Sequence, residues 1–265
     1  MITSNSNDRI VAIRKLLESK HRRATNRFLA EGLRVVAQAL ESHAAVDEIV
    51  YAPDLLISEF GQDLVARAEF AGIPVIDVSP SVFFTLAQKD KPQGIAAVIQ
   101  QKWLNLPETK AQPGDLWVAL QAVQNPGNLG TVLRTCDAVG ANGLLLLDDC
   151  TDPYDPAAVK ASMGSIFTVP LARGRLQDLR DWLAANPVLK VVGSSDRAEL
   201  DCFKAAYPET CLVLMGSERE GLPDGYFALC DDVVRIPMEG ACDSLNLSVA
   251  TAVILYQIYA HRRMG

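Results

Sequence analysis

Polar side chains gather in three stretches of the second half of the chain, each joined to an apolar segment. These stretches are Asn125–Gly140, Leu212–Pro223 and Ile236–Ser248. The third places two serines, an asparagine and an aspartate before an apolar helix, although a helix start needs only one capping side chain. The surplus of hydrogen-bonding groups predicts a ligand site. Open α/β sheets hold their ligands in this way, just beyond the carboxyl ends of the strands.

The first two stretches carry side chains suited to binding an anion. Arg134 follows the predicted helix start by about two turns, and its side chain leans back toward Asn128. In the second stretch, Gly216 and Gly221 allow a ligand to approach the backbone. Between them, Glu218 has the geometry to hold an arginine by a bidentate pair.

Each motif also has a purely structural interpretation. Arg134 fits an ion pair with a structural carboxylate, and the two glycines fit an ordinary turn. In the third stretch, one polar residue is expected to cap the following helix. That role leaves the remaining groups, among them Ser244, Asn246 and Ser248, without an explanation.

Composition disfavours several classes of site and protein. The chain has 265 residues, of which 49% are hydrophobic and 22% charged, as in ordinary soluble globular proteins. Its six cysteines form no CxxC pair and its three histidines lie outside the polar stretches, which disfavours a metal site or a histidine-based triad. Neither GxGxxG nor GxxxxGK[ST] is present, which argues against a dinucleotide-binding dehydrogenase.

The same features bear on location. The sequence shows no secretory signal, and no apolar run approaches the roughly 20 residues that cross a bilayer. Together with the unpaired cysteines, this predicts a reduced, cytoplasmic protein without a membrane partner.

Charge is distributed unevenly along the chain. Residues 1–34 carry eight Lys or Arg against three acids, so their net charge is +5 within a chain of net charge −7. A basic end of this kind indicates contact with phosphates, although a solvated face of an amphipathic helix explains it equally well. The cations that we expect to contact phosphates are Arg14, Lys20, Arg22, Arg23 and Arg27.

Hydrophobic periodicity predicts two α/β domains joined by a linker at 101–115. The first domain, 1–100, has expected helices at 10–17, 31–40, 62–71 and 81–88 and expected strands at 48–51, 74–78 and 95–99. The second, 116–265, has expected strands at 116–120, 143–147, 188–193, 211–215 and 233–236 and helices at 127–139, 156–163, 176–185 and 246–262. The second set of strands is almost wholly apolar, which is typical of a parallel sheet covered on both faces.

The three stretches resemble the three ordered motifs of the SpoU (TrmH-type) branch of the SPOUT RNA methyltransferases: NPGNLGTVLRTCDAVGA, LVLMGSEREGLP and RIPMEGACDSLNLSVATAVILYQ. The first half, with FLAEGLRVVAQAL, is similar to the substrate-binding domain of ribosomal-RNA members. The resemblance implies 2′-O-methylation of RNA ribose with S-adenosylmethionine, and the extra domain favours ribosomal RNA over tRNA. It also implies a deep trefoil knot in the mostly parallel C-terminal sheet and a homodimer through that domain.

The resemblance also assigns roles to individual residues. Positions matching the family's reactive residues are Asn128, Arg134, Glu218, Ser244 and Asn246. Positions expected around the methyl donor are Leu214, Gly216, Ser217, Ile236, Met238 and Leu245. Lys160 stands where the family usually has a phosphate-gripping arginine, and Asn125 where it commonly has an aspartate. A non-catalytic RNA-binding assembly factor that has kept the fold remains an alternative.

A guanidinium holds its proton far above neutral pH, so Arg134 is poorly suited to the role of general base proposed for its counterpart in the family. We expect Arg134 to clamp a phosphate and to orient the ribose hydroxyl instead.

Overall fold

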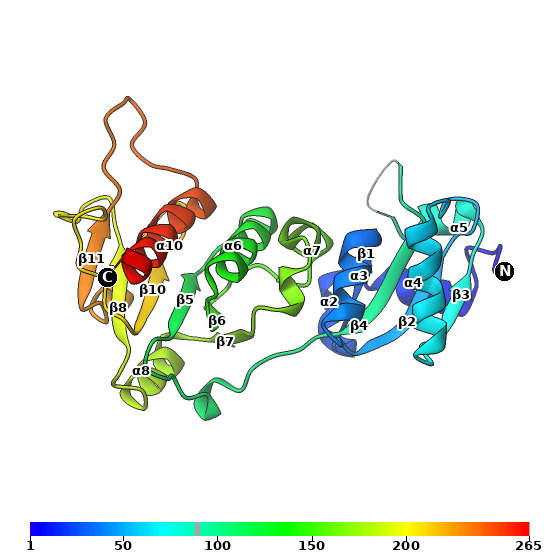
Figure 1. Ribbon diagram of the computed structural model, residues 1–265, viewed down its shortest axis with the longest axis horizontal. Coiled ribbons are helices and arrows are strands. Elements are labelled where there is room, and N and C mark those ends of the chain that lie inside the picture. Colours follow the sequence, from blue (N-terminus) through cyan, green and yellow to red (C-terminus); the bar gives the residue numbers. More distant parts are fainter. Residues whose placement is uncertain (88–90, 265) are drawn as a thin grey trace. The chain divides into compact units, whose positions relative to one another are not determined.

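The computed structural model describes residues 1–87 and 91–264 and divides the chain into two compact units (Figure 1). The N-terminal unit is Met1–Gln101 with Asp152–Thr168, and the C-terminal unit is Lys102–Thr151 with Val169–Gly265. The sequence predicted that 152–168 belong to the second domain, and here the structure differs. The reason is aromatic packing, because the ring of Phe28 lies 4.7 Å from that of Tyr154 and 6.2 Å from that of Phe167.

The N-terminal unit is a four-stranded sheet in the order β1-β4-β2-β3, with helices packed on it. Strand β4 is antiparallel to β1 and β2, and β2 is parallel to β3. The elements are α1 (Asp8–Lys15), α2 (Ser19–Thr25), β1 (Arg27–Glu31), α3 (Leu33–Glu41), β2 (Val46–Tyr51), α4 (Glu59–Phe70), β3 (Val75–Asp77), α5 (Pro80–Phe84), β4 (Ile95–Gln100), α7 (Pro156–Ser162) and the 3₁₀ turn η2 (Ser165–Phe167).

Two elements of this unit, α2 and β1, were not expected from the sequence. The buried run Phe28-Leu29-Ala30 forms the centre of β1, so the helix expected at 31–40 begins only at Leu33. The helix expected at 81–88 is the short α5, capped by Ser79 and opened by Pro80, and position 88 lies outside the described residues.

The C-terminal unit is a seven-stranded sheet in the order β7-β6-β5-β10-β8-β11-β9, and all of its strand pairs are parallel. Every strand expected from the sequence is present, and β7 and β9 are additional. The elements are the 3₁₀ turn η1 (Leu106–Glu108), β5 (Leu116–Gln121), α6 (Pro126–Val139), β6 (Gly143–Leu147), β7 (Leu171–Gly174), α8 (Leu176–Ala184), β8 (Lys190–Ser194), β9 (Leu200–Asp201), β10 (Cys211–Met215), α9 (Asp224–Phe227), β11 (Asp232–Arg235) and α10 (Leu247–Met264).

Two helices that are far apart in the sequence lie side by side in this unit. Figure 1 shows α10 along α6, with which it is in contact, and α10 also contacts the central strand β10. Near its C-terminal end, Arg262 donates to the carbonyl oxygens of Gly114 and Asp115, both at 3.1 Å, and to that of Glu209. Arg262 therefore fixes α10 to the chain segments that lead into β5 and β10.

Because all strands of the sheet are parallel, their carboxyl ends lie at one edge. The loops that follow β5, β10 and β11 start from this edge, and they contain the three polar stretches. The fold thereby brings together residues that are about 90 and 120 positions apart in the sequence. Within 1–87 and 91–264, no helix has the length and apolar character needed to span a membrane.

Candidate functional site

The first turn of α6 is fixed by its own cap. The side-chain oxygen of Asn125 accepts hydrogen bonds from the backbone N–H groups of Gly127, at 2.8 Å, and Asn128, at 3.1 Å. Pro126 occupies the first helical position, where its missing N–H costs nothing. Asn125 keeps the capping oxygen of an aspartate without its charge, so Asn128 is positioned at the end of β5 by a neutral cap.

A chain of hydrogen bonds joins the three polar stretches. Asn128 donates from Nδ2 to Oε1 of Glu218, at 2.9 Å. Asn246 donates from Nδ2 to Oδ1 of Asn128, at 3.1 Å. Ser248 donates from Oγ to Oδ1 of Asn246, at 2.7 Å. The donors all run in one direction and end on the carboxylate, so each bond polarises the next.

Asn246 has two roles in this chain. Its Oδ1 also accepts from the backbone N–H of Ser248, at 2.9 Å, so Asn246 is the residue that caps α10. The capping interpretation of the third stretch is therefore correct for this residue. The same amide uses its NH₂ group to reach Asn128, so the cap couples the start of α10 to the start of α6.

Glu218 is held at the tip of a tight turn after β10. Ser217 and Gly221 exchange backbone hydrogen bonds of 3.2 and 3.1 Å across this turn, and Gly221 has a φ of +68°. A Cβ atom on Gly216 would lie 2.1 Å from the carbonyl carbon of Gly221, so only glycine fits there. The backbone on both sides of Glu218 is thus fixed by the sequence.

Arg134 lies apart from this chain of hydrogen bonds. It follows Asn128 by six residues, which is about 120° around the helix and about 9 Å along its axis. Its side chain is exposed, and it forms no ion pair with Glu218 in the described structure. The partner of Glu218 in the described structure is thus the amide of Asn128 and not an arginine.

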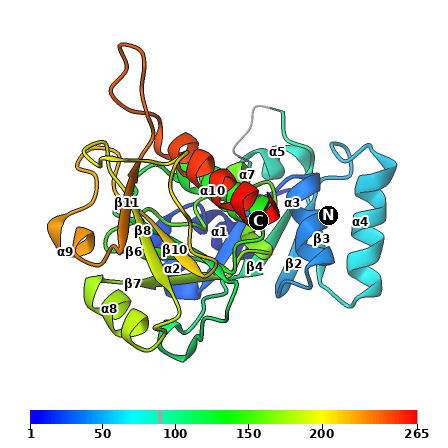
Figure 2. The same ribbon diagram turned by 60° about the vertical axis from the view of Figure 1, so that its left-hand side comes forward.

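The residues expected around a methyl donor differ widely in exposure. Gly216 is buried, Ser217 and Ile236 are half-buried, and Ser244 is exposed. Met238 and Leu245 are 36% and 38% exposed, on the long connection between β11 and α10 that Figure 2 shows extending from the sheet. Leu214 is fully buried in the core, so only its backbone could contact a ligand, and its place around the donor stays a prediction.

The burial of Arg22 contradicts the prediction that this residue contacts RNA. Its side chain is 1% exposed and forms ion pairs with Asp152, at 2.7 Å, and Asp155, at 3.2 Å. It donates further to the carbonyl oxygens of Leu16 and Leu17, at 3.0 and 2.8 Å. A guanidinium with these partners has no surface for RNA, and its function is to hold α2 against the segment that leads into α7.

The remaining basic residues expected to contact RNA stay at the surface of the N-terminal unit. Lys20 and Arg23 are exposed, and Arg27 is half-exposed and paired with Asp47. Arg14 is partly buried and donates weakly to Thr85, at 3.5 Å.

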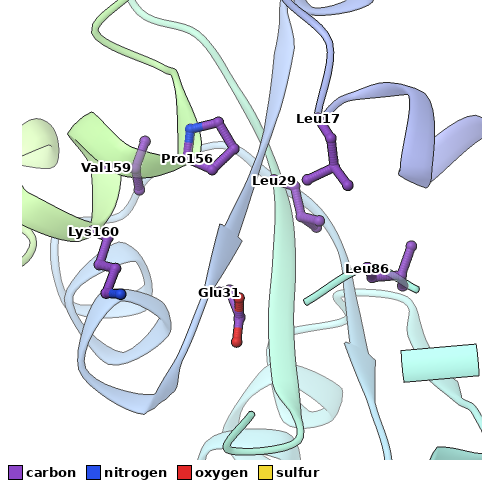
Figure 3. A pocket seen from close by; sticks show the side chains of 7 residues that line it. All are labelled: Leu17, Leu29, Glu31, Leu86, Pro156, Val159 and Lys160. Atoms are coloured by element: carbon purple, nitrogen blue, oxygen red, sulfur yellow. The ribbon is translucent and has the colours of Figure 1, made fainter. Parts of the chain in front are cut away.

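Lys160, on α7, lines a small cleft with Glu31 and five apolar side chains: Leu17, Leu29, Leu86, Pro156 and Val159 (Figure 3). The cleft offers about 20 Å³, which is room for a water molecule and not for a nucleobase.

The cysteines are unsuited to nucleophilic chemistry. Burial raises the pKa of Cys136 to about 12 and that of Cys150 and Cys230 to about 11, so these thiols are protonated at neutral pH. All six cysteines are free, and only Cys242 is exposed. Among the described residues, no cluster of His, Cys, Asp or Glu has the arrangement of a metal site.

Sequence reasoning assigned no role to two members of the site. Ser248 extends the chain of hydrogen bonds, and Asn125 positions Asn128. The Asn-Pro dipeptide before α6 is a sequence signal for a helix start and could have identified the role of Asn125. Ser248 was noted only as one of the surplus polar groups, because its bond to Asn246 is not visible in the sequence.

Comparisons with known proteins show which family the chain belongs to. A model of the SpoU rRNA methylase family matches residues 115–256, and a model of the MRM3-like substrate-binding domain matches residues 7–97. A 23S rRNA (uridine(2479)-2′-O)-methyltransferase from Streptomyces viridochromogenes is 30% identical over 100% of this chain and 93% of its own length. A 23S rRNA (guanosine(2553)-2′-O)-methyltransferase, RlmP, from Bacillus subtilis is 31% identical over 97% of this chain and 98% of its own length.

The chain is also similar to solved structures. The AdoMet-bound rRNA methyltransferase from Sinorhizobium meliloti superposes with a TM-score of 0.89, at 35% identity over 98% of this chain and 97% of that one. The likeness extends over both compact units.

Proposed function

Because the chain belongs to the SpoU rRNA methylase family, we propose that it transfers a methyl group from S-adenosylmethionine to the 2′-hydroxyl of a ribose in ribosomal RNA. The observation that carries this proposal is the chain of hydrogen bonds from Ser248 through Asn246 and Asn128 to Glu218. It unites the three motifs at the edge of the sheet where open α/β folds bind ligands.

The loops after β10 and β11 fit a donor that has an apolar ring and a polar tail. The backbone of Gly221 fills the space of a Gly216 side chain, so the turn after β10 is held in one conformation, and a donor that binds at this turn would meet its backbone N–H and C=O groups. Met238 and Leu245 expose apolar surface in otherwise polar loops, and this surface is suited to covering an adenine ring. S-adenosylmethionine supplies a methyl group already activated on a sulfonium, so the protein need not provide a nucleophile or a metal.

The residues of the chain then have three tasks: to hold the ribose, to orient its hydroxyl and to exclude water. Asn128 and Asn246 present a fixed pair of amides, and Glu218 holds the direction of their hydrogen bonds. Ser244, on the exposed part of the same loop, is available to contact the sugar or to assist loss of the hydroxyl proton.

Arg134 is assigned to a phosphate of the bound RNA. Its guanidinium is exposed and unpaired in the described structure, and it stays charged at any working pH. A bidentate guanidinium–phosphate contact fixes the backbone and thereby the hydroxyl next to it. Arg134 lies about 9 Å along α6 from Asn128, so the phosphate contact would lie beside the amides of Asn128 and Asn246 and not on them.

The N-terminal unit is proposed to select the RNA. Its exposed cations Lys20, Arg23 and Lys160, together with the partly engaged Arg14 and Arg27, give a surface for backbone phosphates. Arg22 is excluded from this surface by its burial.

We propose that the enzyme works as a homodimer through the C-terminal unit. On α10, Val249 and Tyr256 are 48% and 49% exposed and lie seven residues apart, which places them on one stripe of the helix. The family's deep trefoil knot is proposed as well, and it is supported by the return of the chain after β11 to pack α10 against β10 and α6. A cytoplasmic location is proposed as well, and the proposed action on ribosomal RNA supports it.

The test is a methylation assay with purified protein, radiolabelled S-adenosylmethionine, and ribosomal RNA or tRNA from a strain lacking the protein. We expect alkali-resistant label at one ribose of ribosomal RNA. Label in tRNA alone would show that the substrate is tRNA and not ribosomal RNA. Tight donor binding without transfer to either RNA would identify a non-catalytic factor.

The Arg134 assignment is tested by two substitutions. If Arg134 clamps a phosphate, Arg134→Lys should retain part of the activity at ordinary pH and Arg134→Ala should lose it, with donor affinity unchanged in both. Equal loss in the two variants, with RNA and donor still bound normally, would exclude the clamp.

A further inference from the structure

Arg173 on the edge strand β7 and Trp103 on the segment beside this strand form a pair of side chains that the proposed site does not use. The guanidinium carbon of Arg173 lies 5.0 Å from the ring centroid of Trp103. Trp103 is half-buried and Arg173 is exposed, and both belong to the C-terminal unit. Such a cation–π contact holds one face of the guanidinium and leaves its N–H edge exposed.

The segment that carries Trp103 is fixed to the sheet. Leu104 donates its backbone N–H to the carbonyl oxygen of Leu171, at 2.7 Å, so the chain runs along β7 beside Arg173. Arg173 pairs in register with Leu146, one residue before the carboxyl end of its strand. Arg173 therefore lies near the carboxyl edge of the sheet, and β7 is two strand spacings, about 10 Å, from β5, the strand that leads into α6 and Asn128.

Arg173 is not engaged by the acids near it. Asp148 accepts a hydrogen bond from the side chain of Gln121, at 3.0 Å, and Asp178 accepts from the backbone N–H of Arg175, at 2.7 Å. Over residues 1–87 and 91–264, Arg173 has no ion pair. Lys102 and Arg175 are exposed next to the pair and add positive charge.

We propose that Trp103 and Arg173 form a second RNA-binding contact, in the C-terminal unit, which holds a backbone phosphate of the RNA strand that enters the site. The indole holds the planar guanidinium in place, and the free N–H edge binds the phosphate oxygens. This inference rests on the proposed action on RNA. It assigns the contact to the chain segment between the two units and to an edge strand, both outside the three polar motifs.

The test compares RNA affinity across a set of variants at several salt concentrations. Arg173→Ala should raise the Kd for the methylated RNA about tenfold, as expected for loss of one charged hydrogen-bonding partner. It should also reduce the slope of log Kd against log salt by about 0.7–0.9, the value for one phosphate contact. Arg180→Ala, which removes an exposed arginine of α8, is the matched control and should leave both quantities unchanged.

The role of the indole is tested separately. Trp103→Phe should keep most of the affinity, and Trp103→Ala should weaken it severalfold, with the Kd for S-adenosylmethionine unchanged in each. Equal Kd values and salt slopes for Arg173→Ala and Arg180→Ala would overturn the proposal. If the wild-type protein methylates no RNA, the proposed function itself fails, and the two failures are thereby distinguished.

Discussion

Replacing Arg22 by methionine is expected to unfold the N-terminal unit at a much lower urea concentration. The side chain is 1% exposed, and it neutralises the carboxylates of Asp152 and Asp155, whose side chains are 12% and 34% exposed. Arg22→Met keeps the volume and removes the charge, so both carboxylates and two carbonyl oxygens lose the guanidinium as a partner. Removing one member of a buried ion pair costs about 3–5 kcal/mol.

This cost corresponds to a measurable shift. With an m-value of about 1–3 kcal/mol/M for urea, the midpoint of unfolding of the N-terminal unit should fall by roughly 2 M. All three tryptophans, at 103, 117 and 182, lie in the C-terminal unit, so their fluorescence reports on that unit alone. Far-UV circular dichroism reports on both units, and the early transition should appear only in that signal.

Arg23→Met is the matched control, because Arg23 is the exposed neighbour of Arg22 on the same helix. Its urea midpoint should equal that of the wild type. If Arg22→Met and Arg23→Met unfold at the same urea concentration, the ion pairs contribute nothing and the reasoning from burial is refuted. Loss of RNA binding by a fully stable Arg22→Met protein would restore the original assignment of Arg22 to the RNA surface.

Two further predictions concern the C-terminal unit. Gly216→Ala should raise the Kd for S-adenosylmethionine at least tenfold in calorimetry, since its Cβ would lie 2.1 Å from Gly221, whereas Gly240→Ala, with nothing within 4 Å, should bind normally. The pKa of Cys136 is raised from 9.0 to about 12, so the folded state holds this proton after the unfolded chain has released it. The stability of the wild type should therefore fall as the pH rises from 9 towards 12. Between pH 8 and pH 10.5, the urea midpoint should fall less for Cys136→Ala than for the wild type. An equal fall in both proteins would contradict the assignment of this raised pKa to Cys136.

The sequence by itself determined the alternation of strands and helices and the identity of the motifs. The strands β5, β6 and β10 are continuous apolar runs, and such runs predict a parallel sheet without any knowledge of the partner strands. Asn128, Glu218 and Asn246 were identified by type and spacing, because a surplus of hydrogen-bonding groups at helix starts and turns is visible in one dimension.

Only the tertiary structure decided which partners the charged side chains take. Arg22 and Arg23 are adjacent and identical in type, yet one is buried against Asp152 and the other is exposed, because a 130-residue separation is closed by packing and not by local pattern. The same physics assigned 152–168 to the N-terminal unit and Glu218 to Asn128 rather than to Arg134. Local periodicity determines which face of a helix or strand is apolar. The partners of its polar side chains depend on how helices and strands from distant parts of the chain pack against one another.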